Sequence, residues 1–257
     1  MIKMKTKVRK KQVVIGSWIS LAHPAIAEIM AKAGFDWLAV DMEHSVITIR
    51  EAEELIRTID LCGVVPLVRL SANDPVQIKR VMDAGAHGVI VPMVNSVVDA
   101  EQAVASVYYP PKGKRSFGLA RAQGYGNKFQ HYLDRVSKET IIIVQVEHID
   151  AVNNLEAILA VEGVDGFMVG PYDLSGSLGV PGQFDHPLVK EAMGRIGTIG
   201  ATSGKAPGIH VIEPRPDELK TRIEQGFRFI AYSVDTRMLD CACRGAFDGI
   251  EGLGLNG

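Results

Sequence analysis

The chain has 257 residues, of which 47% are hydrophobic, and a formal net charge of −2. This length suits one large domain, and α/β barrels of this size are routinely single domains. A chain so close to neutral gives no electrostatic case for binding nucleic acid or an anionic membrane. No apolar run approaches the roughly 18 residues of a membrane span. We therefore expect residues 1–257 to form one domain with neither nucleic acid nor membrane as a partner.

The ends of the chain and its cysteines bear on its location in the cell. Residues 1–11 are rich in lysine and arginine, and no apolar segment typical of a secretory signal follows them. We expect these residues to form a flexible, solvated basic tail. Cys62, Cys241 and Cys243 form no disulfide framework and lack the companion ligands of a zinc site. The reducing cytoplasm is the expected compartment.

Strand-like and helix-like segments alternate along the whole chain. The strand-like runs are continuously apolar, as is typical of parallel strands buried on both faces. They predict strands at 13–18, 37–41, 64–70, 88–92, 141–147, 166–170, 207–211 and 229–233. The amphipathic stretches between them predict helices at 24–33, 48–61, 75–84, 97–107, 151–160, 187–202 and 216–225.

This alternation indicates the fold class. Eight strands alternating with helices over about 250 residues predict a (β/α)8 TIM barrel. A doubly wound sheet is the alternative, but the number of units and the lack of a usable nucleotide-binding loop disfavour it. The one long connection, residues 108–134, is expected to cover a site or to meet a neighbouring subunit.

Two carboxylates leave successive predicted strands. Glu147 and Asp173 each follow an apolar run, and Gln145 lies on the same side of its strand as Glu147. In a barrel these strand ends meet at one rim. Carboxylate oxygens can ligate a hard divalent cation while leaving positions open for a bidentate 2-keto acid. Mg²⁺ and Mn²⁺ are the first candidates, followed by Co²⁺ and Zn²⁺.

Other strand ends supply cationic and acid–base groups. Arg69 can stabilise an enolate oxygen with charge-assisted hydrogen bonds. His44 can exchange protons near neutral pH, directly or through a metal-bound water. For His210 a functional and a structural role both stay open. Lys205 precedes the strand at 207–211 and therefore points to the opposite face, so that Schiff-base chemistry is disfavoured.

Five positions at this rim are expected to contact the substrate. They are Trp18, Gln145, Gly170, Tyr172 and Ile212. Trp18 and Gly170 end their own strands, whereas Tyr172 and Ile212 belong to loops expected to select the aldehyde.

Eight short segments together form a specific pattern: Asp-Met-Glu-His at 41–44, Pro-Leu-Val-Arg at 66–69, Asp-Ala-Gly-Ala at 83–86, Gly-Val-Ile-Val-Pro at 88–92, Tyr-Pro-Pro at 109–111, Arg-Ala at 121–122 with Tyr-Gly at 125–126, Val-Glu at 146–147 and Gly-Pro-Tyr-Asp-Leu-Ser at 170–175. From about residue 16 to residue 234 the chain resembles the HpcH/HpaI aldolases, the metal-dependent class II pyruvate aldolases. The resemblance implies a barrel of the phosphoenolpyruvate/pyruvate type, whose last helix is swapped between subunits in a hexamer of paired trimers.

The resemblance also implies roles for site residues. Glu147 and Asp173 are implied as metal ligands, and Gln145 as a substrate contact. Arg69 is implied to stabilise the transition state, and His44 to act as the catalytic base.

A further role comes from the resemblance alone, because it implies that Asp83 raises the basicity of His44. Two positions depart from the pattern of the family. Tyr172 stands where Ser or Ala is frequent, and Ser116 stands where Gly is frequent.

The sequence thus predicts a lyase that reversibly cleaves a 4-hydroxy-2-oxo acid to pyruvate and an aldehyde through a metal-stabilised pyruvate enolate. In this reaction His44 takes the proton of the C4 hydroxyl, and Arg69 helps to stabilise the enolate. The alternatives are an oxaloacetate decarboxylase or macrophomate-synthase-like enzyme, an acyl-CoA lyase of the citrate lyase type, and a non-catalytic metabolite-binding barrel. The expected partners are a 2-keto acid, an aldehyde and further copies of the chain in a trimer or hexamer.

Overall fold

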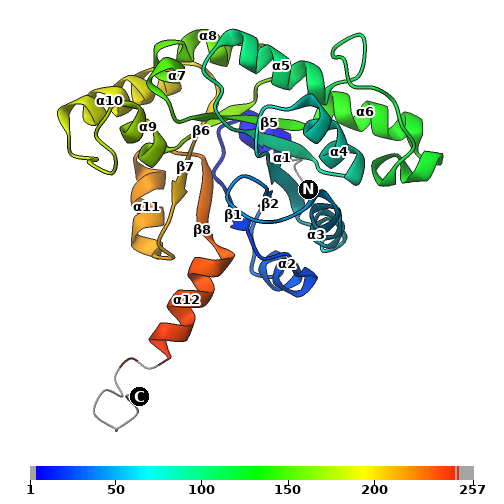
Figure 1. The fold of residues 1–257 in the computed structure, drawn as a ribbon, viewed down its shortest axis with the longest axis horizontal. Helices are drawn as coiled ribbons and strands as arrows, with labels where there is room; N and C mark the ends of the chain where they lie inside the picture. The colour runs from blue at the N-terminus through cyan, green and yellow to red at the C-terminus, as the bar shows by residue number, and fades with distance from the viewer. Residues whose placement is uncertain (1–3, 247, 249–257) are drawn as a thin grey trace.

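The computed structural model describes residues 4–246 and 248, and its strands form one closed parallel barrel (Figure 1). Each strand pairs with the next in the sequence, and the last pairs with the first. This confirms the predicted TIM barrel, with each strand end within one residue of its prediction. The strands are β1 (Val14–Ile19), β2 (Trp37–Asp41), β3 (Val65–Arg69), β4 (Gly88–Val91), β5 (Ile141–Val146), β6 (Gly166–Val169), β7 (Ala206–Val211) and β8 (Phe229–Val234).

The helices surround this barrel, and they include all the predicted ones. The predicted helix at 151–160 is two helices, because Asn154 leaves the helical conformation and its side chain donates to the Asn95 carbonyl. Three further α-helices, α1, α6 and α9, and the 3₁₀ helix η1 were not expected, whereas α12 is a last helix after β8, as the resemblance implied. The helices are α1 (Met4–Arg9), α2 (Pro24–Ala31), α3 (Ile49–Leu61), α4 (Pro75–Ala84), α5 (Val97–Val107), η1 (Arg121–Gly126), α6 (Phe129–Glu139), α7 (Ile149–Asn153), α8 (Leu155–Ala160), α9 (Pro171–Ser177), α10 (Pro187–Thr202), α11 (Pro216–Glu224) and α12 (Asp235–Gly245).

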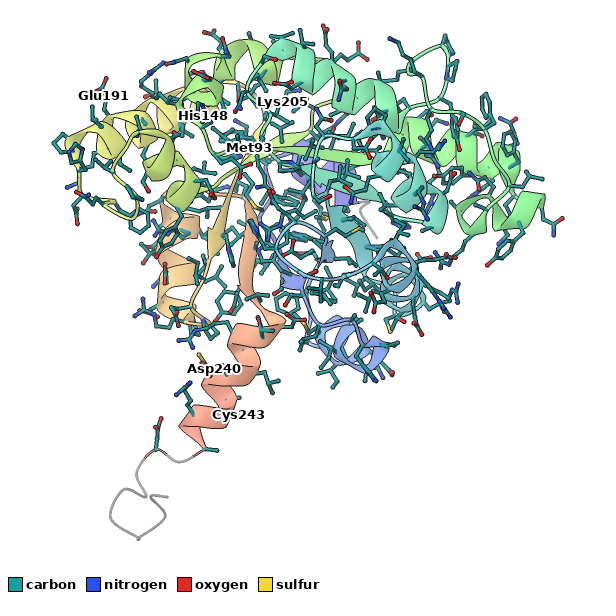
Figure 2. The ribbon with its side chains drawn as sticks, viewed as in Figure 1. Met93, His148, Glu191, Lys205, Asp240 and Cys243 are labelled. Atoms are coloured by element: carbon teal, nitrogen blue, oxygen red, sulfur yellow. The ribbon has the colours of Figure 1, made fainter. Side chains whose placement is uncertain are left out.

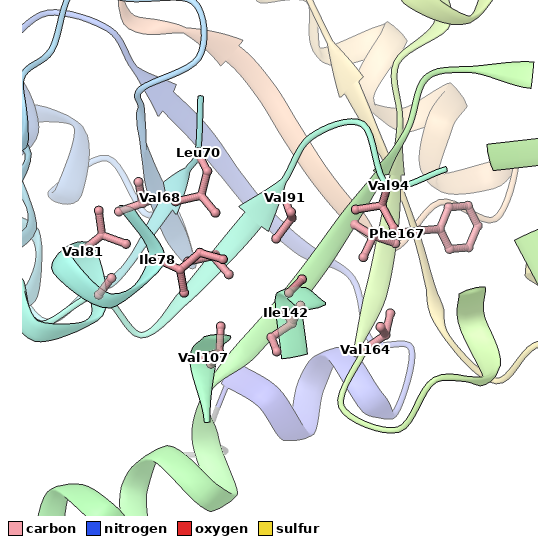
Figure 3. Packing of buried hydrophobic residues seen from close by; sticks show 14 of the residues in the cluster. Val68, Leu70, Ile78, Val81, Val91, Val94, Val107, Ile142, Val164 and Phe167 are labelled. Atoms are coloured by element: carbon pink, nitrogen blue, oxygen red, sulfur yellow. The ribbon is translucent and has the colours of Figure 1, made fainter. Parts of the chain in front are cut away.

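The core has two layers, one inside the barrel and one between barrel and helices. Inside, the rings of Trp37 and Phe229 stack at 4.5 Å. A Cβ on Gly16 would lie 2.0 Å from the Trp37 ring, so only glycine fits there. Outside, side chains of α4 such as Ile78 pack against strand residues such as Val68 (Figure 3). The strands are therefore buried on both faces, which explains their continuously apolar sequences.

The prediction of a flexible basic tail is wrong for residues 4–9, which form α1. Met4 and Val8 are buried on one side of this helix, one turn apart. Lys5 is only 3% exposed, and its ammonium group lies 3.1 Å from the Asp165 carboxylate. Burial lowers the pKa of Lys5, although Asp165 acts in the opposite direction. The high positive charge of residues 4–9 favoured a solvated tail, although Met4 and Val8 form an apolar stripe and Lys5 has a buried partner in Asp165.

Helix α12 leaves the end of β8 and projects away from the barrel (Figure 1). Its first residue, Asp235, accepts hydrogen bonds from the backbone amides of Ser20 and Leu21 at 2.9 and 2.8 Å. Asp235 is the only buried residue in the described part of α12, and Asp240 and Cys243 lie on its projecting part (Figure 2). Within a single chain, α12 is thus anchored near its start, where Met238 also packs against the core and Arg237 donates to Glu213, and no residue after Asp235 in its described part is buried. None of the helices described has both the length and the apolar character needed to cross a membrane.

Candidate active site

Glu147 and Asp173 border the same small space at the carboxyl ends of the strands. Glu147 directly follows β5, and Asp173 lies in the first turn of α9, just after β6. A Cβ on Gly170 would lie 3.3 Å from Glu147 Oε2 and 3.6 Å from Asp173 Oδ2. Two carboxylates this close to one point fit a hard divalent cation. Among the residues described, no group of three or more metal-binding side chains occurs, so such a cation would take further ligands from water and substrate.

The Glu147 carboxylate is held in place from two sides. The Met93 amide donates to Oε1 at 2.6 Å, and Gln145 Nε2 donates to Oε2 at 2.7 Å. Met93 has a φ of +50°, a left-handed conformation that is uncommon for a residue other than glycine. Figure 2 labels Met93 close to the strand ends. Gln145 Oε1 is buried without a hydrogen-bond partner and can accept a bond from a bound water or substrate.

Arg69 is held by Asp41, a residue that the sequence analysis had placed at a strand end without a role. Arg69 donates from Nε and Nη2 to the two Asp41 oxygens, at 2.9 and 2.6 Å. Its Cζ lies 4.2 Å from the centre of the Trp18 ring. Burial would raise the pKa of Asp41, but the hydrogen bonds and charge of Arg69 outweigh it and lower this pKa. These contacts use the Nε donor and one of the two Nη2 donors, so the second Nη2 donor and both Nη1 donors remain for a ligand.

His44 and Glu43 follow Asp41 in a tight turn. Asp41 Oδ1 accepts hydrogen bonds from both of their backbone amides, at 3.0 Å from Glu43 and 3.2 Å from His44. The His44 side chain is 63% exposed, and its Nε2 lies 3.8 Å from Glu43 Oε2. The turn therefore presents the His44 side chain to solvent just after the carboxyl end of β2.

Glu43 is a site residue that the sequence analysis missed. Its Oε2 lies 3.5 Å from Arg69 Nε and 3.5 Å from Gln145 Nε2. Burial, and then the nearby Glu147 carboxylate, raise the pKa of Glu43 to about 7. Its only signal in the sequence was its position next to His44 in the segment 41–44.

Asp83 does not meet His44 within one chain. It lies in the last turn of α4, which runs antiparallel to the strands and places it about 12 Å from the end near the rim. There it pairs with Arg115, and Gln123 Nε2 donates to it at 3.3 Å. It also lines a surface hollow of about 320 Å³ together with Arg50 and Arg121. A contact with His44 therefore requires a second copy of the chain.

The remaining predicted contacts differ in accessibility. Tyr172 is 56% exposed, and its ring meets that of Phe184 edge-on at 4.7 Å. Ile212, directly after β7, is 40% exposed. Trp18 is sealed beneath Arg69 and thus supports the guanidinium group. Tyr172 and Ile212 are the predicted contacts that border open space.

Comparisons with known proteins identify the family of the chain. The HpcH/HpaI aldolase/citrate lyase family model matches residues 14–241. The chain is 40% identical over 228 residues to a 4-hydroxy-2-oxo-heptane-1,7-dioate aldolase of Escherichia coli (strain SE11), covering 88% of this chain and 86% of the relative. A solved HpcH/HpaI family protein from Burkholderia cenocepacia J2315 has a TM-score of 0.91 at 34% identity, over 97% of this chain and 99% of that one. Macrophomate synthase shares the fold, with a TM-score of 0.85 at 24% identity, over 98% of this chain and 90% of that one. The chain belongs to the HpcH/HpaI aldolase/citrate lyase family.

Proposed function

We propose that the protein is a metal-dependent aldolase that reversibly cleaves a 4-hydroxy-2-oxo acid to pyruvate and an aldehyde. The observation that carries this proposal is the space bordered by Glu147 and Asp173, with Arg69 nearby and oriented by Asp41. The relatives named as aldolases support a carbon–carbon lyase. A non-catalytic barrel has no need for a cation site, a fixed guanidinium group and an exposed histidine at one rim.

Glu147 and Asp173 are the residues proposed to hold the cation, with Mg²⁺ or Mn²⁺ preferred because both ligands are carboxylate oxygens. A divalent cation bound there polarises the ketone of a chelated keto acid and favours negative charge on its oxygen. Gln145 donates from Nε2 to Glu147, and its buried, unpartnered Oε1 can accept a hydrogen bond from a water or the substrate. Met93 and Gln145 hold Glu147 ready for this role before any ligand arrives.

Arg69 is proposed to stabilise the oxygen that becomes negative when the C3–C4 bond breaks. Its guanidinium is fixed by two hydrogen bonds to Asp41 and covered by Trp18 on one side. A donor oriented in advance needs no reorganisation as charge develops, and this is the main source of electrostatic catalysis.

His44 is proposed to accept the proton of the C4 hydroxyl during cleavage and to return it during aldol addition. Its exposure at the rim suits a group that acts on the outer half of the substrate. Asp83 is proposed to support His44 from a neighbouring copy, because within one chain Asp83 lies in the last turn of α4 and pairs with Arg115 there.

The assembly is proposed to be a trimer or hexamer in which α12 packs on a neighbouring barrel. The support for this proposal is that only Asp235 of the described part of α12 is buried in its own chain. A second copy would cover the rest of the helix and bring Asp83 to the rim of its neighbour.

A pyruvate-release assay tests the proposed function. The purified protein is incubated with a panel of 4-hydroxy-2-oxo acids and with oxaloacetate, first in EDTA and then with Mg²⁺ or Mn²⁺ restored. We expect no pyruvate release from the hydroxy-oxo acids in EDTA, and we expect release to return only when Mg²⁺ or Mn²⁺ is restored. If oxaloacetate is the only substrate turned over, the protein is assigned as a decarboxylase and not as an aldolase. Release in excess EDTA, or from no substrate, would reject the proposal.

A further inference from the structure

His210 lies on the inner face of the barrel, near the carboxyl end of β7. It stands opposite Ala231 of β8 in the sheet register and shares its face with Ala206, which belongs to the inner core. Its ring meets the Trp18 ring edge-on, with centres 5.9 Å apart. Trp18 in turn lies under Arg69, at 4.2 Å. His210 is thus part of the layer directly beneath the proposed keto-acid site.

The hydrogen bonds of His210 determine which ring nitrogen is free. The ring hydrogen-bonds the Ser233 carbonyl, which also accepts a bond from Ser17 Oγ at 3.1 Å. Nε2 is buried and has no partner, so Nδ1 makes the bond to Ser233 and carries the proton. The remaining lone pair, on Nε2, is an acceptor.

The surroundings keep this ring neutral. Burial, and then the positive charge of Arg69, lower the pKa of His210 to about 4, although Ser233 and Asp41 act in the opposite direction. Nε2 therefore keeps its lone pair at neutral pH and can only accept a hydrogen bond. A buried acceptor without a donor is rare in native proteins and indicates an absent partner.

A second unpartnered group lies on the neighbouring ring. Trp18 Nε1 is also buried without a partner, and an indole N–H can only donate. A hydroxyl group can donate a hydrogen bond and can also accept one, so it matches the acceptor on His210 as well as the donor on Trp18. A carboxylate or a ketone has no proton for His210, and a methyl group serves neither ring.

We propose that His210 contacts the substrate, with its Nε2 accepting a hydrogen bond from a substrate hydroxyl group. The proposal rests on the proposed aldolase function and adds to it a preference for hydroxylated substrates. The hydroxyl can belong to the keto-acid half, on C3, or to the aldehyde half. A hydroxyl in either position donates the same hydrogen bond to His210. Pairs of substrates that differ only in this hydroxyl distinguish the two positions.

Aldol addition kinetics with matched pairs test this proposal. Hydroxypyruvate is compared with pyruvate as the keto acid, and glycolaldehyde with acetaldehyde as the acceptor, at saturating Mn²⁺. For the wild type we expect a higher kcat/KM for the hydroxylated member of one pair. His210→Leu removes the acceptor and should lower that preference about tenfold. His210→Gln keeps an acceptor and should restore most of it.

Ile209→Val, on the opposite face of β7, is the control for a disturbed strand. Thermal unfolding of each variant shows whether the fold is retained. The substrate pair whose kcat/KM ratio falls in His210→Leu shows whether the contacted hydroxyl belongs to the keto acid or to the aldehyde. Unchanged ratios for both pairs would overturn the proposal and leave an ordered water as the partner.

A second measurement does not depend on turnover. The ¹⁵N chemical shift of His210 Nε2, assigned by its loss in His210→Gln, reports hydrogen bonding to that atom. We expect it to move when hydroxypyruvate or glycolaldehyde binds, but not with pyruvate or acetaldehyde. If the chemical shift moves but the protein shows no aldolase turnover, the contact with His210 is supported and the proposed function is rejected. If neither hydroxylated ligand moves the chemical shift, the contact itself is rejected.

Discussion

Asp41 and Arg69 stand opposite each other at the ends of β2 and β3, and their side chains form a forked pair with hydrogen bonds of 2.9 and 2.6 Å. The same Asp41 carboxylate also accepts the backbone amides of Glu43 and His44. One buried carboxylate therefore positions both the arginine and the histidine proposed to act on the substrate. A disturbance at Asp41 should reach two catalytic groups at once.

Asp41→Asn is the direct test of this link. An amide offers a single oxygen, so it cannot accept both guanidinium bonds, and Arg69 keeps its charge without a buried counterion. We expect kcat to fall about a hundredfold, as for a misplacement of about 1 Å, and the unfolding free energy to fall by about 3 kcal/mol. Steady-state kinetics and urea unfolding measure the two effects. Glu53→Gln breaks the exposed pair with Arg57 and should cost less than about 1 kcal/mol.

Glu147→Ala and Asp173→Ala should each abolish metal-dependent pyruvate release, because each removes one of the two proposed protein ligands. Calorimetric titration with Mn²⁺ should show that binding is lost in both variants. Glu156→Ala, which removes an exposed carboxylate on α8, is the control and should keep wild-type binding. Full activity of either ligand variant would contradict the assigned metal site.

Gly170→Ala should weaken the same site without removing a ligand. The new Cβ would lie 3.1 Å from Glu147 Cβ and 3.3 Å from its Oε2, closer than ordinary contact. The φ of −104° at Gly170 is open to alanine, so the effect arises from crowding rather than from backbone strain. We expect Mn²⁺ affinity to fall about tenfold. Gly176→Ala, in α9 with nothing within 4 Å of its new Cβ, should leave the affinity unchanged.

The raised pKa of Glu43 predicts a pH-dependent stability of the metal-free protein. The pKa of about 7 lies above the value of 4.5 for an unfolded chain, so the folded state holds the proton more tightly. The stabilisation from this proton is complete below about pH 4.5 and is lost as the pH rises through 7. Glu43→Gln removes the titration, and its unfolding free energy should gain about 2 kcal/mol relative to the wild type between pH 5 and 8. Urea unfolding in EDTA checks this prediction, and a constant difference across that range would refute it.

Subunit complementation tests the role proposed for Asp83. His44→Ala and Asp83→Ala should each be poorly active alone. If Asp83 serves the His44 of a neighbour, mixed oligomers of the two variants contain some sites with both residues intact. Co-refolding at equal amounts should then restore about a quarter of wild-type activity, as for random assortment around a symmetric ring. Sedimentation analysis confirms the assembly, and no recovery in mixed oligomers would place Asp83 outside the site.

The sequence by itself determined the barrel and most of its rim. Strands buried on both faces must be continuously apolar, so each strand could be located within one residue. Side chains at the ends of parallel strands must meet at one rim, and this rule alone predicts that Glu147, Asp173, Arg69 and His44 lie near one another. Both arguments depend on local patterns and on a general rule of the fold.

Only the tertiary structure decided which groups are paired and which are left without a partner. Lys5 and the buried carboxylate of Asp165 that pairs with it lie in segments far apart in the sequence. The raised pKa of Glu43, caused by burial and by the nearby Glu147 carboxylate, likewise depends on residues from several strands. The same holds for the unpartnered Nε2 of His210. Burial and pairing are properties of three-dimensional neighbours, and a linear pattern of residue types does not record them. The strand ends could therefore be located from the sequence, whereas the protonation and hydrogen bonding at those ends required the folded barrel.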